Sequence, residues 1–201
     1  MKKQTSSSAC SDSGMGTMTI SLTGFMGCGK SSTGRELAVL LGCPFVDLDS
    51  AIEEKTGRSI PEIFRESGES CFRKIEHDTL LEILSSPEYA GGEDTGIKVI
   101  SLGGGTLMTP ECARLVKERT LCFYLRAATE TLVGNLENDF TGRPMLDTGG
   151  LSGVSGLKRR IEELMASRAG VYESTASRII DIEGKSFSDI AREIASLIKV
   201  F

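Results

Sequence analysis

The sequence has a single histidine and no Cys-x-x-Cys pair among its six cysteines, which leaves little from which to build a zinc site. No apolar run approaches the length of a membrane span, so we expect no membrane partner. The net charge is −5 and long runs of lysine or arginine are missing, which argues against a nucleic-acid partner. We interpret the scattered cysteines as free thiols in a reducing compartment and expect a cytoplasmic protein.

The composition is that of an ordinary globular protein, with 201 residues of which 39% are hydrophobic and 25% charged. Residues 1–16 differ, because they are polar and rich in serine, and we interpret them as a disordered tail. An organelle-targeting segment is less favoured there, since the stretch has no arginine and no amphipathic pattern. Residues 17–201 are long enough for a single domain with a sizeable core.

Short apolar segments alternate with helical patterns along this domain. Strands are predicted at 17–23, 43–48, 97–102, 120–125 and 177–182, and the last helix is predicted to open near Ser188. Ser59 and Glu62 have capping-box spacing at the start of another helix. Alternating strands and helices predict an α/β fold with a parallel sheet and a ligand site at the carboxyl ends of its strands.

The segment Gly24-Phe-Met-Gly-Cys-Gly-Lys30-Ser31 fits the phosphate-binding pattern G-x-x-x-x-G-K-[ST], and a predicted strand and helix flank it. We therefore expect a P-loop NTPase fold, with ATP as a co-substrate. Lys30 would reach the outer phosphates, and the Ser31 hydroxyl would bind Mg²⁺ directly. The nucleotide-binding residues predicted from the loop are Gly27, Cys28, Gly29, Lys30, Ser31 and Ser32.

Two acids and a run of glycines follow other predicted strands. Asp47 and Asp49 close the second strand, where a spacing of two would direct both side chains to one side. One could hold Mg²⁺ through water and the other could face a hydroxyl; alternatively, both could cap the next helix. Gly103-Gly104-Gly105 follows the third strand and would allow either close approach to a ligand or a tight turn.

The Asn-Lys-x-Asp guanine motif that GTPases usually carry after a later strand is missing from the sequence, which argues against a GTPase switch.

These motifs together resemble the shikimate kinase family. The likeness rests on the P-loop, Phe-Val-Asp-Leu-Asp, Phe-Arg-Lys-Ile-Glu, Ser-Leu-Gly-Gly-Gly-Thr, Arg-Pro-Met-Leu and Ser-Arg-Ala-Gly-Val-Tyr, in that order from about residue 17 to 198. The resemblance implies a three-layer fold with a five-stranded parallel sheet in the order 2-3-1-4-5. It also implies transfer of the ATP γ-phosphate to the 3-hydroxyl of shikimate, within chorismate and aromatic amino-acid biosynthesis, by an enzyme that we expect to be a monomer.

The resemblance also implies roles for single residues. Asp49 would bind the shikimate hydroxyls and position or deprotonate the nucleophile, and Asp47 would lie in the magnesium shell through water. Arg73 and Arg168 would grip the substrate carboxylate, since arginine offers a planar fork of donors. An alternative for Arg73 is a helix-surface ion pair with Glu69 or Glu76. The remaining substrate-pocket residues would be Gly103, Gly104, Gly105, Phe64 and Phe72.

A glycine-rich segment at about 134–156 is predicted to form a mobile lid. The resemblance makes its Arg143 a third catalytic and nucleotide-binding residue, beside Lys30 and Asp49. One departure concerns the residues just before this segment, where the family often has an arginine that stacks on adenine. Here the stretch 132–139 contains no arginine, so the resemblance assigns no adenine contact.

Two other functions fit the P-loop. A kinase of another small metabolite, such as gluconate, is disfavoured by the set of Asp49, Arg73, three glycines and Arg168, which suits a hydroxylated ring acid. A non-catalytic relative that binds nucleotide as a regulatory module is disfavoured because Lys30, Ser31, Asp49 and Arg143 are all present.

Overall fold

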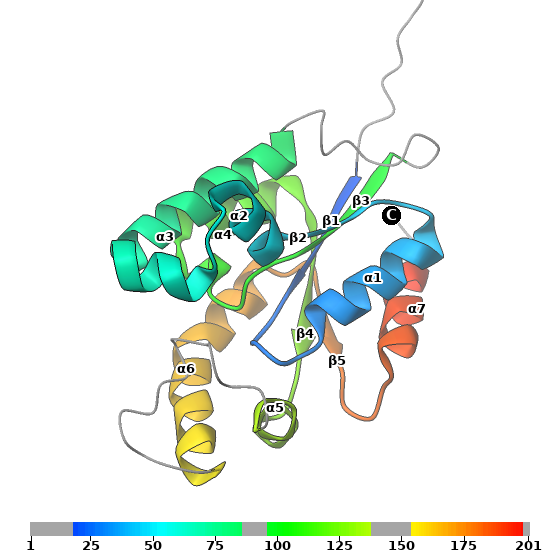
Figure 1. Ribbon diagram of the computed structural model, residues 1–201. Helices are drawn as coiled ribbons and strands as arrows, with labels where there is room; N and C mark the ends of the chain where they lie inside the picture. The colour runs from blue at the N-terminus through cyan, green and yellow to red at the C-terminus, as the bar shows by residue number, and fades with distance from the viewer. Residues whose placement is uncertain (1–17, 86–95, 138–153, 199–201) are drawn as a thin grey trace, which may run out of the picture.

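The computed structural model describes residues 18–85, 96–137 and 154–198 (Figure 1). Five parallel strands form one sheet in the order β2-β3-β1-β4-β5, so the predicted fold class and strand order are confirmed. The strands are β1 (Met18–Thr23), β2 (Phe45–Asp47), β3 (Ile97–Ser101), β4 (Leu121–Arg126) and β5 (Arg178–Asp181).

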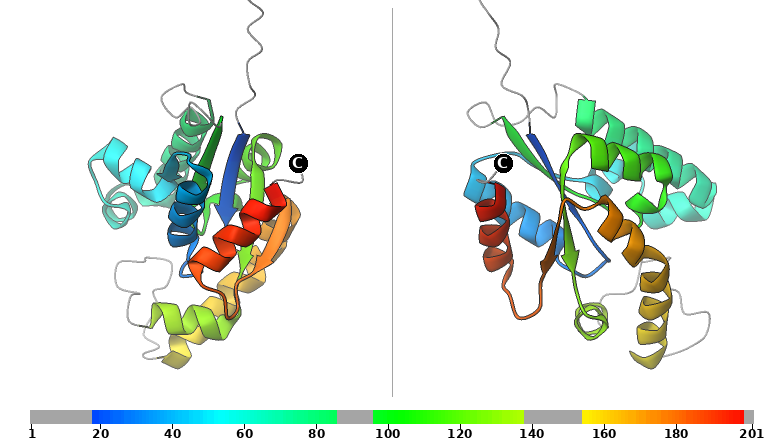
Figure 2. Two further views of the ribbon diagram at one scale, coloured as in Figure 1. Left: turned by 90° about the vertical axis from the view of Figure 1, so that its right-hand side faces the viewer. Right: turned by 180° about the vertical axis from the view of Figure 1, so that it is seen from behind.

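Helices cover both faces of the sheet and give the protein three layers. In Figure 2, α1 and α7 lie on one face, while α3, α4 and the C-terminal part of α6 lie on the other. The helices are α1 (Lys30–Leu41), α2 (Leu48–Thr56), α3 (Ile60–Ser85), α4 (Pro110–Arg119), α5 (Thr129–Leu136), α6 (Val154–Thr175) and α7 (Phe187–Ile198), with a 3₁₀ turn, η2 (Thr106–Met108), after β3. Within the described residues, no helix combines the length and the apolarity needed to cross a membrane.

The core consists of two apolar layers separated by the sheet. Alternating residues of the central strands point to opposite faces, so Phe123 and Leu125 pack toward α1 and α7 whereas Cys122 and Tyr124 pack toward α3 and α4. These side chains are almost completely buried. The two layers fix the carboxyl ends of β1, β2 and β3 side by side, where the loops that follow them meet.

The second strand is shorter than predicted, and this corrects the interpretation of the two acids. β2 ends at Asp47, whose carboxylate accepts a hydrogen bond from the Ser50 N–H at 3.3 Å and caps α2. Asp49 therefore lies in the first turn of α2 rather than on the strand. The expectation that strand alternation aligns the two carboxylates is wrong, and the helix-capping alternative holds for Asp47.

Several helix boundaries and kinks follow directly from short sequence signals. Glu62 accepts hydrogen bonds from the Ser59 N–H at 2.9 Å and the Ser59 hydroxyl at 2.7 Å, as the capping-box spacing predicts. A kink divides α3 at Gly68, where φ is 77°. Both ends of the segment predicted as a lid, 134–156, belong to helices, because Leu136 is buried in α5 and Gly156 is buried in α6. The central part of that segment, including Arg143, lies outside the described residues.

Candidate active site

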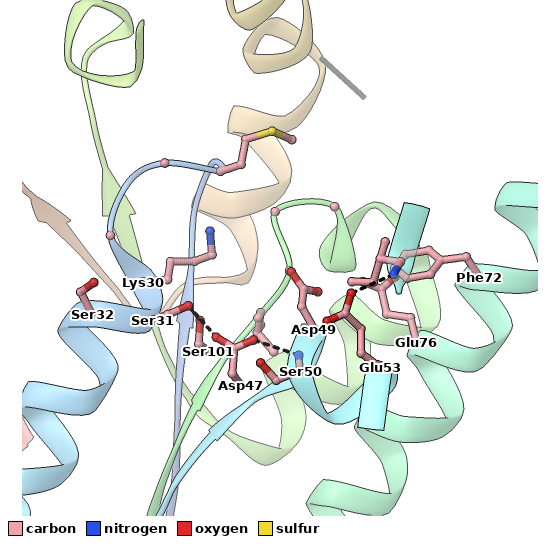
Figure 3. A pocket seen from close by; sticks show the side chains of 18 of the residues that line it. Lys30, Ser31, Ser32, Asp47, Asp49, Ser50, Glu53, Phe72, Glu76 and Ser101 are labelled. Atoms are coloured by element: carbon pink, nitrogen blue, oxygen red, sulfur yellow. Dashed lines mark hydrogen bonds between the residues drawn. The ribbon is translucent and has the colours of Figure 1, made fainter. Parts of the chain in front are cut away.

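A cleft of about 700 Å³ opens at the carboxyl ends of the strands (Figure 3). It runs between the loop after β1, the start of α2, the middle of α3 and the glycines after β3. Most of the site residues predicted from the sequence line it, although they come from segments far apart in the chain. These are Gly27, Gly29, Lys30, Ser31, Ser32, Asp47, Asp49, Phe64, Phe72, Arg73, Gly103, Gly104, Gly105 and Arg168.

The P-loop holds its lysine in a fixed position. Gly29 has φ 83°, a left-handed conformation that glycine adopts without strain, and the next residue begins α1. Lys30 is buried, and its ammonium donates to the carbonyl oxygens of Gly24 and Phe25, both at 3.0 Å. The loop therefore presents one buried positive charge at a helix N-terminus, which is a favourable environment for phosphate.

Cys28 differs from the other predicted nucleotide-binding residues, since it is not among the residues that line the cleft. Its side chain is buried in the core, where desolvation raises the pKa of the thiol. Its backbone N–H donates to the Phe25 carbonyl at 3.3 Å. The side chain of Cys28 thus packs into the core behind the loop and does not face the cleft.

The oxygen atoms around Ser31 suit a hard divalent cation. The Ser31 hydroxyl donates to the Asp47 carboxylate at 2.5 Å and lies 3.3 Å from the Ser101 hydroxyl (Figure 3). Magnesium is bound in kinases by one or two protein oxygens together with substrate phosphates and water. The described residues contain no cluster of three or more His, Cys, Asp or Glu side chains that could hold a metal alone. The residues present therefore fit Mg²⁺ that is shared with a nucleotide.

Asp49 is the most perturbed carboxylate of the cleft. Its pKa is raised to about 6, mainly by burial and then by the nearby negative charge of Asp47, while Lys30 opposes the shift. In Figure 3 its carboxylate points into the cleft between Lys30 and Glu76. A carboxyl group with a pKa near neutrality is suited to accept a proton from a hydroxyl.

The triple glycine packs directly against these functional groups. A β-carbon on Gly103 would lie 2.7 Å from the Asp49 carboxylate, and one on Gly105 would lie 2.7 Å from the Arg73 guanidinium. A β-carbon on Gly104 would lie 3.1 Å from the Met26 nitrogen in the P-loop. The glycines are needed because the loop, the acid and the arginine approach one backbone segment closely.

Glu76 orients the side chain of Arg73, although the sequence suggested Glu76 only as an alternative ion-pair partner on the helix surface. Its guanidinium donates to Glu76 at 2.8 Å and to Glu69 at 3.1 Å. Glu76 is 1% exposed and also accepts a hydrogen bond from the Thr106 hydroxyl at 2.7 Å. The spacing of three residues on one helix indicated this pair, but only the fold shows that Glu76 lines the cleft and is almost completely buried there.

Arg168 comes from α6 on the far side of the glycine segment. Its guanidinium donates to the Gly104 carbonyl at 3.3 Å and lies 5.7 Å from the centre of the Phe25 ring. The Tyr172 hydroxyl, one helical turn further on, donates to the same carbonyl oxygen. Tyr172 is a supporting residue that the sequence analysis did not single out, although it ends the motif that contains Arg168.

Phe64 and Phe72 form the apolar wall of the same end of the cleft. Their rings lie 4.6 Å apart, and the Arg73 guanidinium lies 5.2 Å from the centre of the Phe72 ring. Arginine donors, a buried acid and an apolar wall suit a small carboxylated molecule with hydroxyl groups. The P-loop, which precedes Asp47 and Asp49 in the sequence, forms the phosphate-binding end of the cleft.

Comparisons with known proteins agree with this geometry. The sequence model of the shikimate kinase family matches residues 26–199. A shikimate kinase of Chlorobium phaeobacteroides is 40% identical over 173 residues, which cover 85% of this chain and 86% of the relative. One from Thermus thermophilus is 38% identical over 175 residues, covering 87% and 86% of the two chains.

Solved structures give the same result. Shikimate kinase from Acinetobacter baumannii in complex with shikimate superposes with a TM-score of 0.79 at 31% identity, covering 91% of this chain and 93% of that one. A gluconokinase from Sinorhizobium meliloti has a TM-score of 0.50 at 18% identity, a likeness of fold alone. From its sequence match, its identity to curated relatives and its fold, this chain belongs to the shikimate kinase family.

Proposed function

We propose that this protein is a shikimate kinase that transfers the γ-phosphate of ATP to the 3-hydroxyl of shikimate, giving shikimate 3-phosphate and ADP. The observation that carries the proposal is one cleft in which Lys30 and Ser31 of the P-loop face Asp49, Arg73 and Arg168. One end of the cleft suits a triphosphate and the other a hydroxylated carboxylic acid. Family membership supports the same reaction.

In this proposal, Arg73 and Arg168 hold the substrate carboxylate and Asp49 accepts a hydrogen bond from the reacting hydroxyl. Lys30, and Arg143 from the lid, neutralise charge on the phosphates. Phosphoryl transfer depends mainly on such positioning and charge stabilisation. The side chains of Ser31 and Asp47 would hold Mg²⁺, the first directly and the second through water, and the cation would supply further positive charge beside the phosphates.

The environment of Asp49 supports its role as the acceptor of the hydroxyl proton. Its carboxylate is largely buried, and its raised pKa makes it a stronger base than an exposed aspartate. Removal of the proton as the phosphoryl group arrives would prevent a positive charge on the attacking oxygen. We also propose that the enzyme works as a monomer in the cytoplasm, where its cysteines stay reduced.

A coupled assay of ADP release tests the function. With Mg²⁺ and ATP, turnover should depend on shikimate, and neither gluconate nor nucleoside monophosphates should replace it. Gluconate is the sharpest control, because a gluconokinase shares the fold. Turnover with gluconate equal to that with shikimate would overturn the assignment.

A further inference from the structure

Helix α5 brings a polar side chain against the P-loop from a distant part of the chain. Asn135 lines the cleft, and its side-chain amide donates to the carbonyl oxygen of Gly27, 108 positions earlier, at 2.9 Å. In Figure 1, α5 lies next to the loop that joins β1 to α1, on the side away from α2 and α3. The reaction as proposed above gives this residue no role.

The peptide between Gly27 and Cys28 needs an outside contact because glycine does not fix the direction of its own carbonyl. Gly27 has φ 80°, and glycine adopts positive and negative φ about equally well. In a trans peptide, the carbonyl oxygen and the next N–H point in opposite directions. A rotation of this peptide would exchange them and place the Gly27 oxygen toward the carbonyl of Phe25, the part of the loop from which Lys30 would reach the phosphates.

Hydrogen bonds hold both ends of this peptide in the structure. The Cys28 N–H donates to the Phe25 carbonyl at 3.3 Å, which is longer than usual for such a bond. The same carbonyl also accepts a hydrogen bond from the Lys30 ammonium at 3.0 Å. At the other end, the contact from Asn135 to the Gly27 oxygen has an ordinary length. Asn135 therefore supplies the firmer of the two constraints on the direction of the peptide.

Helix α5 is itself anchored at both ends, so the amide reaches the loop from a fixed position. Near its C-terminal end, Leu136 is buried, and a β-carbon on Gly27 would lie 2.8 Å from its γ-carbon. At the N-terminal end, Glu183 accepts hydrogen bonds from the Ala128 N–H at 2.7 Å and from the Thr131 hydroxyl at 2.6 Å. These contacts satisfy donors at the start of the helix and fix its position against the loop after β5.

We propose that Asn135 is a positioning residue that holds the Gly27–Cys28 peptide in the orientation in which the P-loop binds a triphosphate. The inference rests on the proposed function, since it assumes that ATP binds at this loop. Loss of one neutral hydrogen bond corresponds to about 2-fold to 10-fold in affinity. The effect should fall on the binding of the phosphates, and the affinity for shikimate should not depend on it.

The experiment measures phosphate binding with and without a nucleoside. Binding of Mg²⁺-ATP and of Mg²⁺-tripolyphosphate is followed by calorimetry for the full chain and for Asn135→Ala. The substitution should weaken both ligands by the same factor, about fivefold, and leave the KM for shikimate within twofold of the wild type. Asn135→Gln keeps an amide donor and should bind both ligands within twofold of the wild type.

The design separates positioning of the loop from a general loosening of α5. Alanine and glutamine both favour a helix more than asparagine does, so neither change weakens the helix itself. Thermal unfolding of each variant checks this expectation. Gly134→Ala is the matched control, because it alters the neighbouring residue of α5 and its new β-carbon meets no atom within 4 Å. This control should keep both affinities.

Three results would overturn the inference. Unchanged affinity for both ligands in Asn135→Ala would mean that the peptide keeps its orientation without the amide. Weaker ATP binding with unchanged tripolyphosphate binding would mean that the amide contacts the nucleoside instead. An equal loss in Gly134→Ala would point to a general disturbance of α5. All three leave the proposed function intact, because shikimate-dependent ADP release from the wild-type enzyme tests that function separately.

Discussion

Arg73 and Glu76 form an ion pair at 2.8 Å in which the arginine side chain is 18% exposed and the acid only 1%. Both residues line the cleft, but the acid is almost completely buried there while the arginine keeps part of its surface open. This arrangement neutralises the guanidinium in part and fixes its direction before any substrate binds. Glu76 also ties Arg73 to the turn after the glycine segment, through the Thr106 hydroxyl.

Replacing the buried acid should affect both stability and substrate binding. Glu76→Gln keeps the shape and an acceptor for Thr106 but leaves Arg73 with Glu69 alone. We expect a loss of about 1–3 kcal/mol in the free energy of unfolding, below the 3–5 kcal/mol of a fully buried pair because Arg73 is partly exposed. Urea unfolding and the KM for shikimate measure the two effects. Glu69→Gln, on the exposed partner, should change stability by less than about 1 kcal/mol; equal effects of both changes would contradict the distinction.

The contact between Gly105 and Arg73 can be tested with one methyl group. The backbone of Gly105 has φ −112°, which suits any residue, so Gly105→Ala should not strain the loop. The new β-carbon would lie 2.7 Å from the guanidinium and displace it. The KM for shikimate should rise at least severalfold while that for ATP changes little. Gly170→Ala, on α6 with open space around it, is the matched control and should keep both constants; an unchanged shikimate KM in Gly105→Ala would show that the arginine position is not critical.

If Arg73 and Arg168 clamp the substrate carboxylate, the forked shape of the guanidinium should matter as well as its charge. Arg73→Lys and Arg168→Lys keep the positive charge but lose the bidentate fork. Each should raise the KM for shikimate about tenfold, with little change in ATP affinity, since a charge-assisted hydrogen bond is worth about 1.5–3 kcal/mol. Shikimate methyl ester provides the check on the ligand side. If the wild type bound the ester as tightly as shikimate, the clamp would be excluded.

Substitutions of Asp47 and Asp49 should affect the activity in different ways. Asp49→Asn removes the proposed proton acceptor and should lower kcat by about 10²–10⁴-fold while ATP still binds. Asp47→Asn removes the negative charge beside the Ser31 hydroxyl and should instead raise the Mg²⁺ concentration needed for half-maximal activity. Magnesium titrations of both variants measure the difference. The same magnesium dependence in the two proteins would refute the division of roles.

Arg143 lies outside the described residues, and its catalytic role is a prediction from the sequence. An arginine delivered to the transferring phosphoryl group is worth about 10³–10⁵-fold in other enzymes of this type. We expect Arg143→Ala to lower kcat by about 10³-fold, at the low end, because Lys30 and Mg²⁺ would remain. The KM values for both substrates should change far less. A kcat within threefold of wild type would remove Arg143 from the catalytic set.

Local signals in the sequence were sufficient to predict the P-loop and the fold class of this protein. The P-loop pattern predicted its own backbone, because glycines adopt the left-handed conformations that few other residues tolerate. Strands that alternate with helices along the sequence predicted the parallel sheet, since a helix that crosses over between two strands lets them run in the same direction. The strand order was implied by the resemblance to the shikimate kinase family and is confirmed, whereas the residue roles that the resemblance implies stay predictions.

Other features depend on contacts between distant segments, and only the tertiary structure decided them. The sequence placed Asp49 on a strand, whereas capping by Asp47 starts a helix there and brings the acid against Gly103. Glu76 looked like a surface partner because helical spacing says nothing about which face is covered. Cys28 sits within the loop motif but faces the core, and Phe187 meets Gly29 across more than 150 residues of chain. Spacing determines which residues share an element, but burial and contact are set by how elements pack, which is a property of the whole chain.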